Sequence, residues 1–234
     1  MTVCFGIVVF PGTWSDRDCV HAVELAGAEA TLLWHADRDL RGADIVVLPG
    51  GFSYGDYLRT GAIARFAPIM EAVREHAWDG GPVLGICNGF QILCEAGLLP
   101  GALLRNDSLQ FRCQPTWLRV DTHSTPFLVG CHPGSTLRVP VSHGEGRFYA
   151  DAKTLAQLNS EGRVALRYSE SDGQLTPDAN PNGSLENIAG ILNEQGNVLG
   201  MMPHPERACE ELLGSADGLQ LFSSAIQALA ARAG

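Results

Sequence analysis

The sequence predicts an α/β fold with a mostly parallel sheet. Apolar runs at 3–10 and 45–48 each stop at a Pro-Gly pair, and a helical segment separates the first run from another apolar run at 30–34. Near-continuous apolar runs are typical of strands that are covered on both faces. Strands that alternate with a helix through short links predict parallel pairing with right-handed crossovers.

The first half of the chain also carries helix signals. Ser15 can cap a helix that has Val20, Val23 and Leu25 on one side and ends at Gly27. A helical region is expected over 63–78. Within it Pro68 is expected to open a second helix, because the missing N–H of proline costs little in a first turn.

Further elements follow along the chain. Strands are expected at 83–86, 112–120, 137–141, 164–168, 188–192 and 198–202, with helices from about 90, at 151–159 and at 219–231, and a turn at 181–184. We expect the strands at 112–120 and 137–141 to be antiparallel. No internal repeat, low-complexity tract or linker divides the chain, so we expect one domain over 1–234.

The composition excludes several classes of protein. The formal net charge is −10, whereas a surface that binds nucleic acid is basic. Lys153 is the single lysine and no G-x-x-x-x-G-K-[ST] motif occurs, so we expect any ATP to be bound by another chain. The first residues lack a basic segment, and no apolar run reaches membrane-spanning length. We therefore expect a cytoplasmic protein that does not enter a membrane.

The seven cysteines favour a reducing compartment. They are odd in number, scattered, and contain no C-x-x-C, which predicts neither a disulfide framework nor a zinc ribbon. Cys131-His132, with Cys113 and His123 nearby, fits no zinc-ligand spacing. We expect no metal site.

The stretch VLGICNGFQ at 83–91 is the most informative part of the chain. A short apolar strand runs into a helix through Cys87, with Gly85 and Gly89 on either side. A strand-turn-helix elbow exposes the side chain at its tip, and the amino terminus of the helix favours a thiolate. Taken alone, Cys87 could also be a small core residue, as buried cysteines commonly are.

A histidine and a glutamate follow the last expected strand. Pro203 and Pro205 stiffen the segment around His204. Residues two apart in an extended segment project to the same side, so His204 and Glu206 can lie together. The carboxylate would then orient an imidazole that accepts a proton from Cys87. For this segment alone, an ordinary surface turn is the alternative.

Two glycine-containing segments are candidates for binding roles. The strand at 45–48 ends at Gly50-Gly51, and in a doubly wound sheet the carboxyl ends of strands line the ligand crevice. Acyl transfer needs donors for the developing oxyanion, each contributing roughly 10²- to 10³-fold in rate. The amides of Gly51 and Asn88 are candidate donors, although Gly-Gly could also be a simple turn. SHGEG at 142–146 is either a substrate-binding loop or a turn.

These motifs resemble a known family. GICNGFQ at 85–91, together with His204-Pro205-Glu206, is similar to the class I, or triad, glutamine amidotransferases. Some members of this family form the small glutaminase subunit of the synthase at the fourth step of purine synthesis. The stretches that resemble those members are PGGFSYGDYLR at 49–59, HGEGR at 143–147, NPNGS at 180–184 and GMMPHPER at 200–207.

The resemblance implies a fold and a set of site residues. The fold would be flavodoxin-like, a doubly wound and mostly parallel sheet, to which the expected antiparallel strands add an extension. Cys87 would be the nucleophile, His204 the base and then the acid, and Glu206 the residue that orients it. Gly51 and Asn88 would supply the oxyanion donors. The expected substrate contacts are Gly50, Gln91, His143 and Gly144.

The resemblance also implies a division of labour. This chain would hydrolyse L-glutamine to glutamate and ammonia through a γ-glutamyl thioester, with no cofactor of its own. A large synthetase subunit would bind ATP and magnesium and use the ammonia to convert formylglycinamide ribonucleotide to formylglycinamidine ribonucleotide. In bacteria a small bridging subunit joins the two. The loop at 53–59 is the expected docking surface.

Other interpretations stay open at this point. The partner could belong to another amidotransferase, such as a guanylate or anthranilate synthase. A cysteine hydrolase or chaperone of the flavodoxin-like peptidase type usually has a histidine directly after the elbow cysteine, whereas Asn88 follows Cys87 here. An inactive regulatory subunit would normally have lost part of the triad, and all three members are present in this chain.

Overall fold

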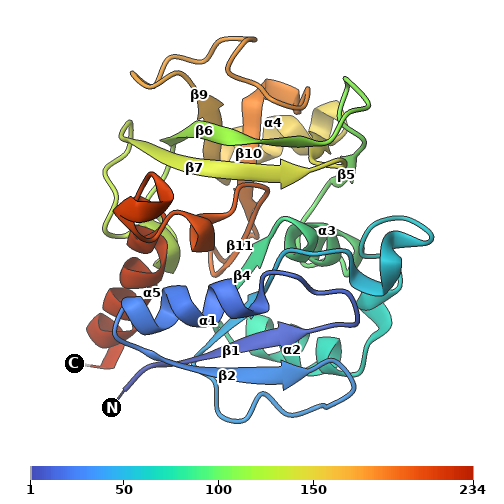
Figure 1. The fold of residues 1–234 in the computed structure, drawn as a ribbon, viewed down its shortest axis with the longest axis vertical. Coiled ribbons are helices and arrows are strands. Elements are labelled where there is room, and N and C mark those ends of the chain that lie inside the picture. Colours follow the sequence, from blue (N-terminus) through green and yellow to red (C-terminus); the bar gives the residue numbers. More distant parts are fainter. Residues whose placement is uncertain (1, 234) are drawn as a thin grey trace.

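The central sheet has one parallel half and one antiparallel half. The structure is a computed structural model that describes residues 2–233, in which nine strands pair in the order β2-β1-β3-β4-β11-β10-β9-β6-β7 (Figure 1). From β2 to β11 neighbouring strands are parallel, and from β11 to β7 they are antiparallel. The order 2-1-3-4 followed by a fifth parallel strand is that of flavodoxin-like folds, so the predicted fold class is confirmed.

The elements have the following bounds. The parallel half contains β1 (Cys4–Val9), β2 (Glu29–Trp34), β3 (Ile45–Leu48), β4 (Val83–Ile86) and β11 (Val198–Met201). The antiparallel half contains β6 (Arg112–Val120), β7 (Thr136–His143), β9 (Val164–Ser169) and β10 (Ile188–Leu192). The α-helices are α1 (Asp16–Leu25), α2 (Ile69–Trp78), α3 (Asn88–Glu95), α4 (Ala152–Ser160) and α5 (Leu219–Ala233). The 3₁₀ turns used below are η1 (Ser53–Asp56), η2 (Ala64–Phe66) and η5 (Pro205–Arg207).

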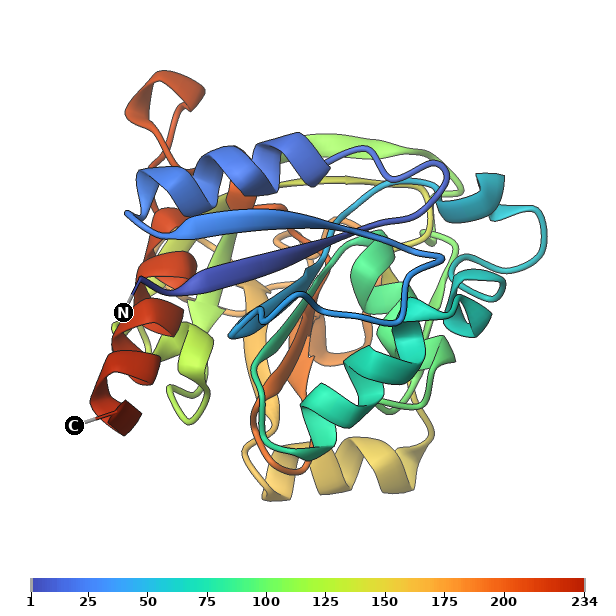
Figure 2. The same ribbon diagram turned by 90° about the horizontal axis from the view of Figure 1, so that it is seen from below.

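Helices cover both faces of the sheet, as a doubly wound fold requires. In Figure 2, α1 lies on one side of β1 and β2 and α2 on the other. Phe222 of α5 packs against Phe5 of β1, with ring centroids 6.2 Å apart. Phe90 of α3 stacks on Phe148 at 6.1 Å. Within residues 2–233, no helix combines the length and apolar character needed to cross a membrane.

Helix α1 differs from the prediction in two respects. Ser15 stands at its N-cap, but the side chain makes no capping hydrogen bond; its Oγ instead accepts from Nη2 of Arg207 at 2.8 Å. Leu25 is 41% exposed, because it lies two residues, or about 200°, around the helix from Val23. The residues of α1 that are buried are Cys19, Ala22 and Val23.

The region at 63–78 contains one α-helix where two were predicted. Before Pro68 there is only the 3₁₀ turn η2, and α2 begins at Ile69. Ala67 has an extended backbone with ψ 141°, because a residue that precedes proline is sterically disfavoured in the helical conformation. Two short strands, β5 (Ala102–Leu104) and β8 (Arg147–Tyr149), were not predicted, since three residues carry too little periodicity.

Three neighbouring parallel strands place the candidate site. β4 pairs with β3 on one side and with β11 on the other. Because their carboxyl ends meet at one edge of the sheet, the segments that follow them lie together. These segments carry Gly50-Gly51 after β3, Cys87 after β4 and His204 after β11.

Candidate active site

Cys87 occupies a strained elbow between β4 and α3. Its φ of 51° and ψ of −104° are unusual for a residue with a side chain, and such strain costs about 1–3 kcal/mol. The Cys87 amide donates to the carbonyl of Met201 at 2.7 Å, which ties the elbow to β11. Its Sγ lies 3.7 Å from the carbonyl oxygen of Ser142 at the end of β7. Neighbouring segments therefore hold the sulfur in place.

The first turn of α3 is packed tightly against β3. A Cβ atom on Gly89 would collide with the carbonyl of Leu48, so only glycine allows the helix to start this close to the strand. The buried side chain of Asn88 accepts from the amide of Ser53 at 3.1 Å and donates to Oε1 of Gln91 at 2.9 Å. The loop after β3 is thereby fixed relative to the elbow.

His204 and Glu206 form a buried pair beside the elbow. Nδ1 of His204 lies 2.5 Å from Oε1 of Glu206, and each residue is 2% exposed. They meet on a 3₁₀ turn, η5, and not on the extended segment that the sequence predicted, because Pro205 suits the first position of a helical turn. The amide of His204 donates to the carbonyl of Pro140 in β7 at 2.8 Å.

The environment of His204 favours the charged imidazolium. Burial alone lowers its pKa, but the Glu206 carboxylate and then Cys87 outweigh burial and raise the pKa to about 10. Within residues 2–233, Nε2 of His204 is buried and has no hydrogen-bond partner. His204 and Cys87 line the same cavity, so Nε2 is available for proton exchange at the sulfur.

Gly50 packs against the imidazole ring of His204. A Cβ atom at Gly50 would lie 2.6 Å from Cε1 of His204, so the absence of a side chain makes room for the ring. Ser15 and Arg207 lie next to this contact, with Arg207 Nε 3.8 Å from Oε1 of Glu206. Gly50, an expected substrate contact, therefore packs under the imidazole and is not part of the cavity lining.

Gly51 and Asn88, the two expected oxyanion donors, both lie next to Cys87. The amide of Phe52, the residue after Gly51, donates to the carbonyl of Gly12 at 2.9 Å. Gly51 has a φ of 152° and pairs with Thr13 in an isolated bridge, so its backbone differs from that of a regular strand. Gly51 lines the cavity together with Cys87. The amide of Asn88 lies in the first turn of α3, where N–H groups have no intrahelical acceptor.

His143 is buried in a network of asparagines. It is 3% exposed; its Nδ1 lies 3.1 Å from Oδ1 of Asn106 and its Nε2 lies 3.4 Å from Nδ2 of Asn182. Burial, and next the charge of His204, lower the pKa of His143 to about 4. His143 is therefore neutral at physiological pH.

The NPNGS motif supports the segment that contains His143. Asn182 Nδ2 donates to the carbonyl of Gly146 at 2.9 Å, and Asn106 Nδ2 donates to the carbonyl of His143 at 2.9 Å. Ser184 Oγ accepts from the amide of Phe148 at 2.9 Å. Asn106 and the two motif residues, Asn182 and Ser184, therefore fix the backbone of residues 143–148. Residues 142–145 line the cavity.

The cavity beside Cys87 has two lobes. They share five lining residues: Gly51, Phe52, Cys87, Phe111 and Ser142. The His204 lobe, of about 220 Å³, is also lined by Trp14, His204 and Arg207. The Asp56 lobe, of about 180 Å³, is also lined by Asp56, Thr60, Gln91, His143, Gly144 and Glu145. Pockets for drug-sized ligands measure about 300–1,000 Å³, so these lobes suit a smaller ligand.

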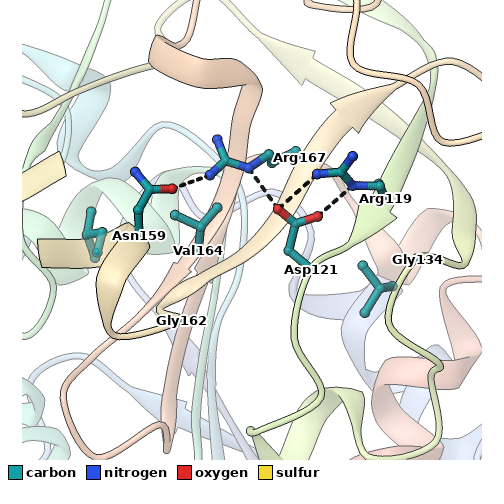
Figure 3. Close-up of a pocket in the computed structure, with 9 residues that line it drawn as sticks. Arg119, Asp121, Gly134, Asn159, Gly162, Val164 and Arg167 are labelled. Carbon is teal, nitrogen blue, oxygen red and sulfur yellow. Dashed lines mark hydrogen bonds and ion pairs between the residues drawn. The ribbon is translucent and has the colours of Figure 1, made fainter. Parts of the chain in front are cut away.

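A separate cavity of about 410 Å³ lies between β6, β9 and α4 (Figure 3). Asp121 lies between two guanidinium groups and accepts from Nε of Arg119 and from Nε of Arg167, each at 2.7 Å. Arg167 also donates to Oδ1 of Asn159 at 2.6 Å and to the carbonyl of Glu186. Oε2 of Glu186 also lies 3.3 Å from Nη1 of Arg167, so each guanidinium group of this network has an acidic partner and the network connects strands and helix.

In the part of the chain from 2 to 233, no group of three or more His, Cys, Asp or Glu side chains is placed to hold a metal ion. Cys131 is buried and Cys113 exposed, and all seven cysteines are free thiols.

Comparison with known protein families gives a match that covers most of this chain. The model of the CobB/CobQ-like glutamine amidotransferase domain matches residues 3–226. The chain belongs to this family. The expected membership of the glutamine amidotransferases is therefore confirmed.

The amidotransferase has close relatives that match over nearly its whole length. Phosphoribosylformylglycinamidine synthase subunit PurQ of Moorella thermoacetica is 58% identical over 223 residues, which cover 95% of this chain and 94% of the relative. The same subunit of Salinibacter ruber is 56% identical over 225 residues and 96% of each chain. The structure of PurLQS from Thermotoga maritima contains a chain with a TM-score of 0.87 and 43% identity, covering 98% of this chain and 100% of that one.

The amidotransferase cavity also contains residues that were not among the expected site residues. Of the expected substrate contacts, Gln91, His143 and Gly144 line the Asp56 lobe. Both polar groups of Gln91 are occupied within the protein, because Nε2 donates to the carbonyl of Glu145 at 2.6 Å and Oε1 accepts from Asn88. The additional lining residues are Trp14, Phe52, Asp56, Thr60, Phe111, Ser142, Glu145 and Arg207. Five of them lie in motifs quoted above: Phe52 and Asp56 in the stretch at 49–59, Ser142 and Glu145 in SHGEG, and Arg207 in GMMPHPER. No signal in the sequence indicated Trp14, Thr60 or Phe111.

Proposed function

We propose that this chain is the glutaminase subunit of phosphoribosylformylglycinamidine synthase and hydrolyses L-glutamine to glutamate and ammonia. The observation that carries the proposal is the convergence of Cys87, His204 and Glu206 at the ends of the adjacent strands β4 and β11. Its support is the 54–58% identity to PurQ subunits over nearly the whole chain. A triad on this scaffold suits covalent acyl transfer.

The first half of the reaction forms a thioester. The Cys87 thiolate attacks the γ-carboxamide carbon of glutamine, and the oxygen that becomes anionic accepts hydrogen bonds from the amides of Gly51 and Asn88. As the tetrahedral intermediate collapses, the carbon–nitrogen bond breaks and the His204 imidazolium protonates the departing nitrogen. Ammonia leaves and the γ-glutamyl group stays on the sulfur.

The second half releases glutamate. Neutral His204 takes a proton from water, which attacks the thioester carbon, and the same two amides hold the oxyanion. Collapse breaks the carbon–sulfur bond and returns the thiolate beside the imidazolium. The Glu206 carboxylate accepts from Nδ1–H, which keeps the proton on that nitrogen, and it stabilises the positive ring.

The ammonia serves a synthetase partner. In this proposal a large subunit binds ATP and magnesium and converts formylglycinamide ribonucleotide to formylglycinamidine ribonucleotide, and a small subunit bridges the two chains. The name PurLQS of the Thermotoga maritima structure supports a multisubunit assembly. This chain itself needs no cofactor in that scheme and works in the cytoplasm.

The loop after β3 is the proposed docking surface for the synthetase. Within this loop, residues 53–59, Tyr57 and Leu58 are 86% and 78% exposed. Phe66 of η2, which lines the same surface hollow as these two side chains, is 73% exposed. This segment stands out from the body of the protein in both views (cyan in Figures 1 and 2). Contiguous apolar side chains at the surface commonly mark a protein interface. The neighbouring Asp56 lines the cavity, so docking here can influence the site.

A Cys87→Ala variant tests the proposal. Assembled with its synthetase, it should lose glutamine-dependent synthesis and keep ammonia-dependent synthesis, whereas Cys113→Ala, at an exposed cysteine, should keep both. A glutamine-mimicking diazo-ketone should label Cys87 in the wild-type chain. Equal loss of both syntheses in Cys87→Ala, or labelling at another residue, would contradict the proposal.

A further inference from the structure

Two carboxylates in the Asp56 lobe lack good partners. Oδ1 of Asp56 is buried and, within residues 2–233, accepts no hydrogen bond. Among residues 2–233, Oε2 of Glu145 accepts a single long bond, from Thr60 Oγ1 at 3.4 Å. Its Oε1 lies 3.3 Å from Nε of Arg105, whose side chain is 78% exposed, so solvent screens that ion pair. Asp56 and Glu145 both line the lobe, so they bring two carboxylates with few hydrogen bonds of their own to its wall.

The carboxylates of Asp56 and Glu145 also repel each other when both are ionised. Burial, and next the nearby Glu145, raise the pKa of Asp56 to about 6. Like charges that share a partly desolvated site repel, and a cation placed between them removes the repulsion. An ammonium group has three donors and would supply the hydrogen bonds that Asp56 and Glu145 lack.

Charge decides which lobe takes which end of a glutamine molecule. Its amide carbon must reach Cys87, where the lobes meet, so its amino-acid end extends into one of them. The His204 lobe contains a histidine with a raised pKa and Arg207, which repel an ammonium group. The Asp56 lobe contains Asp56 and Glu145 and attracts it.

We propose that Asp56 and Glu145 bind the α-ammonium group of glutamine and make the site specific for the free amino acid. This inference rests on the proposed glutaminase function and names residues of the same site. It gives the loop after β3 a second role, since Asp56 at the end of η1 comes from the segment that carries exposed Tyr57 and Leu58.

Kinetics of the assembled synthase test the inference. The substrates are L-glutamine and 4-carbamoylbutanoate, which lacks only the α-amino group, and the variants are Asp56→Asn and Glu145→Gln. In the wild type, KM should be about 10- to 100-fold higher for the analogue, the range expected for loss of a charged hydrogen bond. Each variant should raise KM for glutamine by a similar factor, change kcat less, and leave KM for the analogue within about twofold.

Two controls make the experiment decisive. Asp172→Asn, at an exposed acid outside the cavity, should behave like the wild type with both substrates. Alkylation of Cys87 by uncharged iodoacetamide reports whether each variant keeps an intact site, because it needs no ammonium group. If one variant fails to fold, the other still tests the inference, because each changes one of the two carboxylates.

Different failures have different meanings. Variants that alkylate normally and keep the wild-type preference would overturn the inference, as would a wild type with equal KM for both substrates. If the variants keep their substrate preference but no longer bind the synthetase, the carboxylates contact the partner and the inference is wrong. If the wild-type complex releases no glutamate from L-glutamine, the proposed function itself fails.

Discussion

The Nδ1 atom of His204 lies 2.5 Å from Oε1 of Glu206, and solvent reaches 2% and 0% of the two side chains. Two charges removed from water are stable only while both are present, because the loss of one leaves the other buried and unpaired. The carboxylate thus controls the charge of the imidazole beside Cys87, and several variants can test this.

Replacing Glu206 by glutamine removes the counter-charge and keeps the shape. We expect the pKa of His204 to fall and kcat for glutamine hydrolysis to drop by roughly 10²- to 10⁴-fold, the contribution of positioned acid–base catalysis. Ammonia-dependent synthesis by the complex should be unchanged. Glu210→Gln, at a more exposed glutamate that pairs with His21, is the control. Glutaminase activity within twofold of the wild type in Glu206→Gln would argue against a triad.

His143 should make the protein sensitive to acid. The folded chain holds His143 neutral with a pKa of about 4, whereas an unfolded histidine titrates near 6.5. Between pH 6.5 and about 4, the unfolded chain binds a proton at this histidine that the folded chain does not bind. The free energy of unfolding therefore decreases as the pH falls through this range, by up to about 3 kcal/mol, and this loss is absent above pH 6.5.

Urea unfolding at pH values from about 4 to 7 measures this effect. His143→Gln should show a flatter dependence of unfolding free energy on pH than the wild type. His21→Gln, at a histidine whose side chain is 53% exposed, should follow the wild-type slope. The same slope in all three proteins would show that His143 is not held neutral.

Asn182 should affect both stability and substrate binding. Truncation to alanine leaves the buried carbonyl of Gly146 with only the longer bond from Ser184 Oγ, at 3.4 Å, which costs roughly 1–3 kcal/mol and loosens the wall of the Asp56 lobe. We expect a lower urea midpoint and a higher KM for glutamine. Asn159→Ala breaks a comparable bond to Arg167 in the network of Figure 3, so it should lower stability without raising KM. A KM increase in both variants would mean that general destabilisation is the cause.

Docking should depend on the exposed loop after β3. Leu58→Glu places a charge on the proposed interface, so we expect weaker association with the synthetase in a pull-down or titration and less glutamine-dependent synthesis. Leu212→Glu, at a leucine that is 94% exposed elsewhere, should bind normally. The isolated wild-type chain should be a slow glutaminase that the synthetase accelerates. Full activity of the isolated chain, or unaltered binding by Leu58→Glu, would contradict this role of the loop.

The sequence by itself determined the fold class and the segments that meet at the site. Apolar runs that end at Pro-Gly pairs indicated β1 and β3, and the glycines around Cys87 indicated an elbow, because both patterns reflect local constraints on burial and backbone geometry. Local signals failed where they were short or ambiguous. The strands β5 and β8 have three residues each, and the effect of Pro68 on the residue before it outweighed the helical pattern upstream.

Only the tertiary structure decided how distant segments contact one another. The edge strand β7 returns to the site, where Pro140 fixes the backbone of His204 and Ser142 contacts Cys87. The Asp56 loop and Glu145 face one lobe although they are far apart in the chain. Periodicity reports which face of a segment is buried, but not which other segment buries it, and that choice depends on the strand order and curvature of the complete sheet.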